Sequence, residues 1–355
     1  MDLRRLTDRR CRQALAAAAL ALLAACNTAK KQEATPYEMT LAAAAMEGQD
    51  YDQAVRQWSA ALNQTLTDDQ RARGLLGRAL AYSKTGNFEG AMDDTNAALK
   101  LKPDLADLFR LRGFLYVHQR DYAHASDDFD AAIRLKADSA EAHAGRAEVR
   151  LLQGNGEAAI TDLDVAISLK PYISGFYTAR GGYYLVIGKT TEGMADFNEA
   201  IRRAPKDPDA YYGRWLADYQ LGRPTDGISD LQTALSLKPE QPYWVMLLHL
   251  THLSGKSPDQ PEFLANAARL SLDKWPGPVL LYYQGKMKAD AVFAAASTAE
   301  AAKHLGQVCE ANYYVGAYLV ATHKEDDGRR LLAAARDTCT PDMTEFLLSG
   351  VALKK

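Results

Sequence analysis

Residues 106–139 read ADLFRLRGFLYVHQRDYAHASDDFDAAIRLKADS, and residues 140–173 follow with AEAHAGRAEVRLLQGNGEAAITDLDVAISLKPYI. The two segments have equal length and carry an arginine, a small residue and an aspartate at equivalent places. The same period extends to both sides, because five helix-ending positions recur at one constant spacing: Pro103, Ala137, Pro171, Pro205 and Pro239. A fixed period of about 34 residues predicts a stack of similar helical units.

Small residues recur at three positions in each period, and large residues occupy the positions between them. Small side chains let two helix backbones approach closely, and the large ones fill the remaining space. At four of the five helix-ending positions the residue is proline, which ends the second helix because it lacks an N–H group and clashes with the preceding turn. The small residues are Ala79, Gly113, Ala147 and Gly181; Ala91, Ala125, Ala159, Gly193 and Gly227; and Ala98, Ala132, Ala166, Ala200 and Ala234.

This pattern resembles the tetratricopeptide repeat, a helix–turn–helix unit of about 34 residues. The resemblance covers residues 72–239. A degenerate repeat precedes them, in which Tyr51, Ala54 and Trp58 match a second helix displaced by three inserted residues. The expected fold class is all-α, a superhelical solenoid of antiparallel helix pairs. The expected segments are a signal peptide, a tether, the repeats, and a region of divergent repeats and capping helices: 1–25, 26–36, 37–239 and 240–355.

A second ladder of charged residues follows the same period. One arginine lies on each first helix and one aspartate on each second helix, always at the same separation along the chain. The arginines could form a basic stripe that binds an anion, but a carboxylate accompanies each of them. We therefore expect Arg–Asp pairs that fix the helix phase and can be bidentate. The ladder residues are Arg78, Arg112, Arg146, Arg180 and Arg214 with Asp94, Asp128, Asp162, Asp196 and Asp230.

The N-terminus has the three parts of a secretory signal. Five arginines precede an unbroken apolar run over residues 14–25, which ends in small residues before Cys26. Leu23-Ala24-Ala25-Cys26 resembles the bacterial lipobox, in which the cysteine becomes the lipidated first residue of the mature protein. The alternative is a plain signal peptide with an incidental cysteine. Asn27, which is not aspartate, favours the outer membrane, with the protein facing the periplasm of a Gram-negative bacterium.

The composition excludes several classes of function. There are 42 basic and 45 acidic residues, so no basic excess points to nucleic acid. No apolar run after residue 30 is long enough to span a bilayer. No phosphate loop, nucleophile elbow or metalloprotease motif is present, and we expect no enzyme activity, cofactor or metal site. The rival interpretation is an enzyme whose site lies within residues 279–305 and uses Lys286, Lys288 or His304.

The C-terminal part is expected to form helices over residues 242–254, 261–272, 279–286, 289–296 and 299–305, followed by a last helical hairpin. Cys309 and Cys339 bracket that hairpin. Antiparallel helices bring the start of the first near the end of the second, so a disulfide is geometrically plausible and closes a loop of about 30 residues. The alternative is a reactive thiol pair, although no C-x-x-C motif is present.

The surface of the first helices is the expected partner-binding groove. Aromatic and arginine side chains are the usual anchors of protein interfaces. Each groove residue could instead pack against a neighbouring repeat or against a returning C-terminal segment. The helical phase predicts the following groove residues: Arg73, Leu76, Leu80, Arg110, Phe114, His118, Glu148, Tyr212, Leu216 and Tyr219.

The C-terminal region carries a more specific resemblance. Trp275, Tyr282, Gly285 and the segment 309–316, CEANYYVG, look like the corresponding part of NlpI-type lipoproteins. That resemblance implies a lipid-anchored periplasmic adaptor that binds envelope proteins, peptidoglycan hydrolases and a protease, and that can form homodimers. The alternative is a structural subunit of an outer-membrane assembly or secretion complex. The chain departs from the family in its more regular repeats and its cysteine pair.

Overall fold

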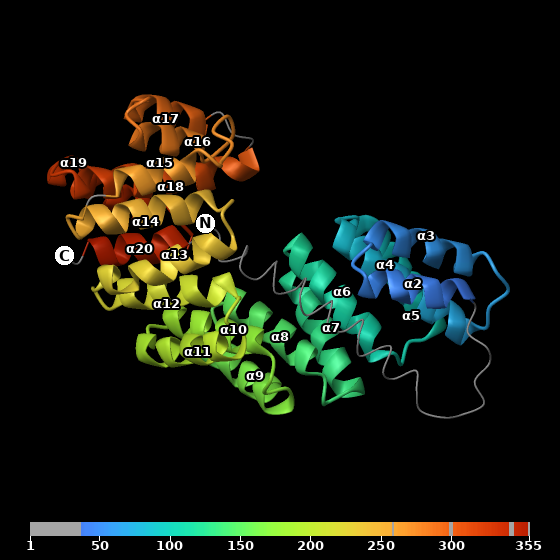
Figure 1. Ribbon diagram of the computed structural model, residues 1–355. Coiled ribbons are helices and arrows are strands. Elements are labelled where there is room, and N and C mark those ends of the chain that lie inside the picture. The colour runs from blue at the N-terminus through green and yellow to red at the C-terminus, as the bar shows by residue number, and fades with distance from the viewer. Residues whose placement is uncertain (1–36, 258, 298–300, 341–343, 354–355) are drawn as a thin grey trace. The chain divides into compact units, whose positions relative to one another are not determined.

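A computed structural model describes residues 37–257, 259–297, 301–340 and 344–353. The expected signal peptide, the lipid-attachment residue Cys26 and the tether lie outside these residues. The described residues are almost entirely helical and contain no strand, which confirms the expected all-α class (Figure 1). They divide into two units, residues 37–171 and 172–353, named here the N-terminal unit and the C-terminal unit.

The N-terminal unit consists of four antiparallel helix pairs, and the helices of each pair pack against one another. The first pair, which precedes the regular repeats, is the expected degenerate repeat. The helices are α2 (Tyr37–Glu47), α3 (Tyr51–Leu62), α4 (Asp68–Thr85), α5 (Phe88–Leu101), α6 (Ala106–Gln119), α7 (Tyr122–Leu135), α8 (Ala140–Leu152) and α9 (Gly156–Leu169).

The C-terminal unit continues with helical pairs and then departs from the period. Its helices are α10 (Ser174–Val186), α11 (Thr190–Arg203), α12 (Pro208–Gln220), the 3-10 helix η1 (Pro224–Gly227), α13 (Ile228–Leu237), α14 (Pro242–Ser254), α15 (Gln260–Ala267), α16 (Gly277–Tyr283), α17 (Ala289–Ser297), α18 (Ala301–Ala321), α19 (Glu325–Thr338) and α20 (Thr344–Ala352).

The turn inside each repeat depends on one residue with a left-handed backbone. The residues concerned recur at the repeat spacing and have φ between 63° and 84°: Gly86, Arg120, Gly154, Gly188 and Gly222. Glycine adopts this conformation without the Cβ clash that other residues suffer. In two of these repeats the second helix begins with a side-chain cap, at Asn87 and Asp121, whose side chains accept from the backbone N–H three residues on.

Large side chains fit where the first helices carry glycine. The Phe129 ring of α7 lies against Gly113 of α6 and Gly145 of α8, and a Cβ atom at Gly145 would approach the ring to 2.4 Å. Phe129 is fully buried and also meets Phe114 edge-on, with ring centroids 5.0 Å apart. The small and large positions of the period therefore interlock between consecutive repeats, as the sequence predicts.

The C-terminal helices differ in places from the sequence expectation. The helix expected over residues 261–272 ends earlier, because α15 closes at Ala267. Residues 301–305, expected to end a separate short helix, are the first turns of α18, which runs without a break to Ala321. No proline interrupts residues 301–321, so nothing in the chain forces a helix end there.

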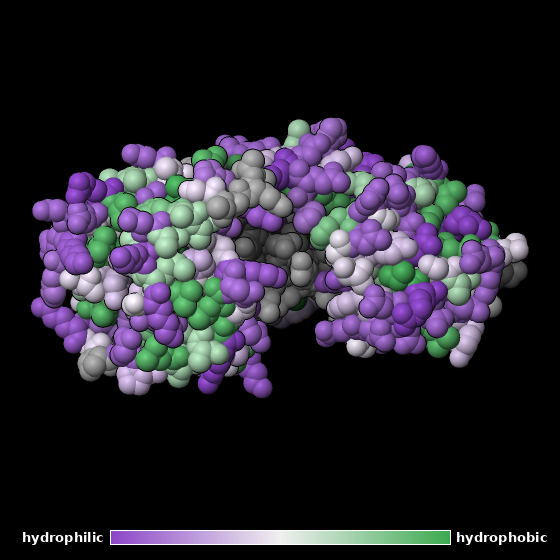
Figure 2. Space-filling model, turned by 90° about the horizontal axis from the view of Figure 1, so that it is seen from above, coloured by the Kyte–Doolittle hydropathy of each residue, from purple (hydrophilic) through white to green (hydrophobic). Residues whose placement is uncertain are grey.

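The outer surface shown in Figure 2 is mainly hydrophilic, with small hydrophobic patches between charged side chains. The largest exposed apolar side chains are scattered along the chain, among them Tyr37, Tyr172 and Leu305. None of the helices in the described part of the chain has the length and apolar character needed to cross a membrane.

Candidate protein-interaction surface

The Arg–Asp ladder forms forked ion pairs inside each repeat. Arg112 on α6 donates from Nε to Asp128 Oδ2 at 2.7 Å and from Nη2 to Asp128 Oδ1 at 2.8 Å. The other four pairs have the same geometry: Arg78 with Asp94, Arg146 with Asp162, Arg180 with Asp196, and Arg214 with Asp230. All five aspartates are buried.

The remaining nitrogen of the guanidinium reaches back to the preceding repeat. Arg112 Nη1 donates to Asn96 Oδ1 at 3.1 Å, and Arg146 Nη1 lies 2.6 Å from Asp130 Oδ1. The hydrogen bond to Asp128 raises the pKa of Arg112, and partial burial opposes this. In these two repeats the arginine therefore joins both helices of its own repeat to the second helix of the preceding repeat. This use of the guanidinium within the protein supports the structural interpretation of the ladder over an anion-binding stripe.

The expected groove residues of the N-terminal unit fall into two groups. Leu76, Leu80 and Phe114 lie in its apolar core, and Arg110 and Glu148 are buried. Arg110 pairs with Asp107 at 2.9 Å. Arg73 and His118 are the more accessible members. Arg73 pairs with Asp69 at 2.9 Å, and the His118 ring packs on Phe88 with centroids 3.7 Å apart.

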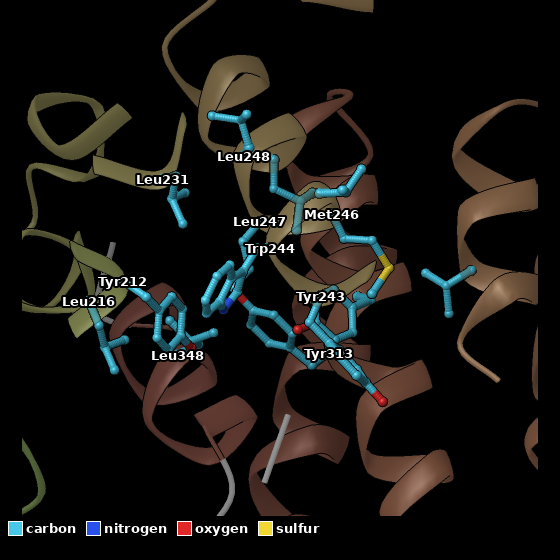
Figure 3. Close-up of a cluster of buried hydrophobic side chains, with 14 of the residues drawn as sticks. Tyr212, Leu216, Leu231, Tyr243, Trp244, Met246, Leu247, Leu248, Tyr313 and Leu348 are labelled. Carbon is cyan, nitrogen blue, oxygen red and sulfur yellow. The ribbon is translucent and has the colours of Figure 1, made fainter. Parts of the chain in front are cut away.

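The expected groove residues of the C-terminal unit lie under helix α20. Tyr212, Leu216 and Tyr219 occupy one face of α12, named here the α12 face. Leu348 of α20 lies beside Tyr212 and Leu216 in the apolar cluster (Figure 3). The Tyr219 hydroxyl donates a long hydrogen bond of 3.5 Å to the Leu348 carbonyl. The C-terminal segment therefore returns onto this face, which is the packing alternative left open by the sequence.

Aromatic rings continue the α12 face into the interior. The Tyr212 ring stacks on Trp244 with centroids 5.3 Å apart and on Trp215 at 5.9 Å. Burial raises the pKa of the Tyr212 hydroxyl well above its usual range. The stacked rings make the α12 face apolar, and the Tyr212 hydroxyl is buried with them.

Two buried carboxylates lie next to this cluster. Glu310 accepts hydrogen bonds from the Tyr243 hydroxyl at 2.7 Å and from Trp275 Nε1 at 2.6 Å. Glu345 at the start of α20 accepts one from the Tyr314 hydroxyl at 3.0 Å. Burial raises the pKa of Glu345, and the nearby charge of Glu310 raises it further. Glu345 is therefore easier to bury when it is protonated.

Cys309 of α18 and Cys339 at the end of α19 form a disulfide. Their Cα atoms are 5.0 Å apart and both residues are buried. The bond closes the hairpin that the sequence places there. Because Cys339 follows the last residue of α19, the disulfide ties this end of α19 to α18.

His249 and His252 lie one turn apart on α14 and contact different residues. His249 Nδ1 lies 2.8 Å from Asp259 Oδ2, whereas His252 Nδ1 lies 2.8 Å from Ser257 Oγ, so the two imidazoles have separate partners. Lys286 is exposed. Within the described ranges, no three His, Cys, Asp or Glu side chains are placed to hold a metal ion.

Comparison with known proteins agrees with this geometry. The family model described as "Tetratricopeptide repeat" matches residues 39–106, 111–172 and 178–243, which is more than half of the chain. The chain belongs to the tetratricopeptide repeat family. No curated protein matches it in sequence.

Several solved structures share the fold of this chain at low sequence identity. PilW, described as a "widely conserved type IV pilus biogenesis factor", is 20% identical over 61% of this chain and 99% of its own, with a TM-score of 0.54. Pseudomonas aeruginosa pilF is 16% identical over 62% and 99%, with a TM-score of 0.52. The Cut9–Hcn1 complex is 15% identical over 70% and 48%, with a TM-score of 0.57. These likenesses show a common fold.

The residues that cover the α12 face of this tetratricopeptide repeat protein were not singled out in the sequence. Leu348 and Glu345 lie outside the repeat period, so no phase argument reaches them. The available signal was the apolar segment EFLLSGVAL at residues 345–353, whose spacing suits a short helix. Its docking site depends on how α18 and α19 place it.

Proposed function

We propose that this tetratricopeptide repeat protein is a lipid-anchored periplasmic scaffold that brings envelope proteins together, in particular peptidoglycan hydrolases and a periplasmic protease. The main observation in support is the stack of helical pairs. The Arg–Asp ladder joins these pairs, and the stack presents a surface for protein partners. Two weak sites on one anchored scaffold raise the effective concentration of their partners without new contacts.

Two features support an exported location. The lipobox-like sequence ends at Cys26, and the remaining cysteines of the chain beyond it form the Cys309–Cys339 disulfide. Disulfides persist in oxidising compartments such as the bacterial periplasm. A tether over residues 27–36 reaches at most about 35 Å, so the repeats would work close to the membrane.

The test is a pull-down from solubilised envelope with residues 26–355, Cys26→Ser, and an N-terminal tag. Arg73 and His118 are the more accessible first-helix positions of the expected groove, so the second bait carries Arg73→Glu and His118→Glu. Arg134→Glu, an accessible arginine on the second helix α7, is the matched control. Substituting Phe114 or Tyr212 would disturb the core, since both are buried.

We expect the first bait and the Arg134→Glu control to recover hydrolases or a protease, and the Arg73/His118 bait to lose them. The opposing result is a fixed, stoichiometric set of outer-membrane assembly subunits that all three baits recover equally. That result would favour the alternative function, a structural subunit of an assembly or secretion complex. PilW, whose description names pilus biogenesis, has the same fold.

A further inference from the structure

We propose that the α12 face is a helix-binding site, that α20 occupies it in cis, and that a partner helix of the same chemistry competes with α20 for it. The partner pattern is an acidic residue followed three residues later by leucine, then two small residues, as in Glu345, Leu348, Ser349 and Gly350. This inference deepens the proposed function. The role of the partner helix rests on that function, whereas the binding of α20 to the α12 face does not.

The contacts of α20 define that pattern. Leu348 is fully buried beside Tyr212 and Leu216 (Figure 3). Its carbonyl accepts a hydrogen bond from the Tyr219 hydroxyl. Glu345 accepts from the Tyr314 hydroxyl of α18. A Cβ atom at Gly350 would collide with the Arg336 guanidinium, so the position after Ser349 has to be glycine or the arginine has to move. Recognition of a helix by apolar anchors on one face is a common mode of peptide binding.

Some contacts of α20 are energetically unfavourable, and this favours its replacement by a partner helix. Glu345 is a fully buried carboxylate near Glu310, and such burial is unfavourable for the ionised form. The Tyr212 and Thr344 hydroxyls lie near each other and are buried, but among the described residues neither makes a hydrogen bond of normal geometry. Buried polar groups without well-formed hydrogen bonds destabilise the arrangement that contains them.

The short length of α20 also favours its release from the α12 face. It spans nine residues, and an isolated helix of that length is not stable in water. α20 is therefore held on the unit by side-chain contacts, including that of Phe346, whose ring centroid lies 4.5 Å from the Arg336 guanidinium carbon. Short terminal elements of this kind belong to the less stable parts of a fold and open without global unfolding.

The test measures binding of a labelled peptide of residues 340–355 to the purified chain 26–355 with Cys26→Ser. In the wild-type chain α20 competes in cis, so the peptide binds weakly. Leu348→Asp in the chain weakens the cis competitor, and we expect the peptide to bind about tenfold tighter or more. Leu347→Asp, on a less buried side of α20, is the matched control and leaves binding weak. Adding Tyr219→Ala to Leu348→Asp removes the gain.

Equal peptide binding by the wild-type and Leu348→Asp chains, with the helical circular dichroism retained, would overturn the proposal. If Leu348→Asp does not fold, hydrogen exchange on the wild-type chain decides. Amides of α20 should exchange about tenfold faster than those of α18, and equal protection would show that α20 opens only with the whole unit. Both measurements use the purified chain and test only the binding of α20. The envelope pull-down tests the proposed function, so either proposal can fail while the other is supported.

Discussion

The Asp128 carboxylate accepts two parallel hydrogen bonds from Arg112, at 2.7 and 2.8 Å, while the third nitrogen of the guanidinium reaches Asn96 in the preceding repeat. One side chain therefore links three helices. Because Asp128 is buried, removing Arg112 would leave a carboxylate without its principal partner.

Arg112→Met should lower the free energy of unfolding by about 2–3 kcal/mol, somewhat less than for a fully buried pair because Arg112 is partly exposed. Arg112→Met with Asp128→Leu should recover much of that loss, since both charges are then gone. Urea denaturation followed by circular dichroism measures the cycle, with Arg134→Met as an accessible control. Equal losses in the single and double variants would show that the pair is not the cause.

Arg120→Gly should stabilise the protein by about 0.5–1 kcal/mol. Arg120 has φ of 63°, at the turn position where the equivalent residues of the following repeats are glycine. Gly154→Ala is the reciprocal change and should destabilise, and since no atom lies within 4 Å of its added Cβ, only the backbone conformation is tested. Thermal unfolding of both variants checks the prediction, which fails if Arg120→Gly lowers the midpoint.

Reduction of the Cys309–Cys339 bond should cost about 3 kcal/mol, because the bond restricts a loop of 30 residues in the unfolded chain. Denaturation with and without dithiothreitol measures the loss. The double variant Cys309→Ser/Cys339→Ser should match the reduced wild-type chain and show no response to the reductant. If dithiothreitol also lowers the stability of the double variant, the loss does not come from the Cys309–Cys339 bond.

Glu345→Gln should stabilise the C-terminal unit at neutral pH and have little effect in acid. Burial raises the pKa of Glu345 in the folded protein above its unfolded value near 4.5. The contribution of the protonated group to stability is fully present below pH 4.5 and is lost as pH rises through the folded pKa. The advantage of glutamine should therefore grow as pH rises above 4.5 and level off above the folded pKa.

Paired urea titrations of the wild-type and Glu345→Gln chains at several pH values test this. Glutamine can still accept the hydrogen bond from Tyr314, so the variant changes the charge with little change in shape. A difference between the chains that is constant with pH would contradict the prediction.

The repeats could be predicted from the sequence because each repeat is held by contacts of short range along the chain. Arg112 and Asp128 are close in sequence, and Phe129 meets glycines of the two neighbouring first helices. The period places these residues on facing surfaces before any tertiary information is known. The family match and the all-α fold confirm that prediction.

The covering of the α12 face was decided by the tertiary structure alone. Tyr219 and Leu348 are far apart in the chain, and no period connects them. The sequence by itself determined where the repeat helices lie and how each ladder arginine is paired, because those contacts recur with every repeat. Which surface α20 covers depends on the path of α18 and α19 and on the disulfide between them, and only packing in three dimensions sets that path.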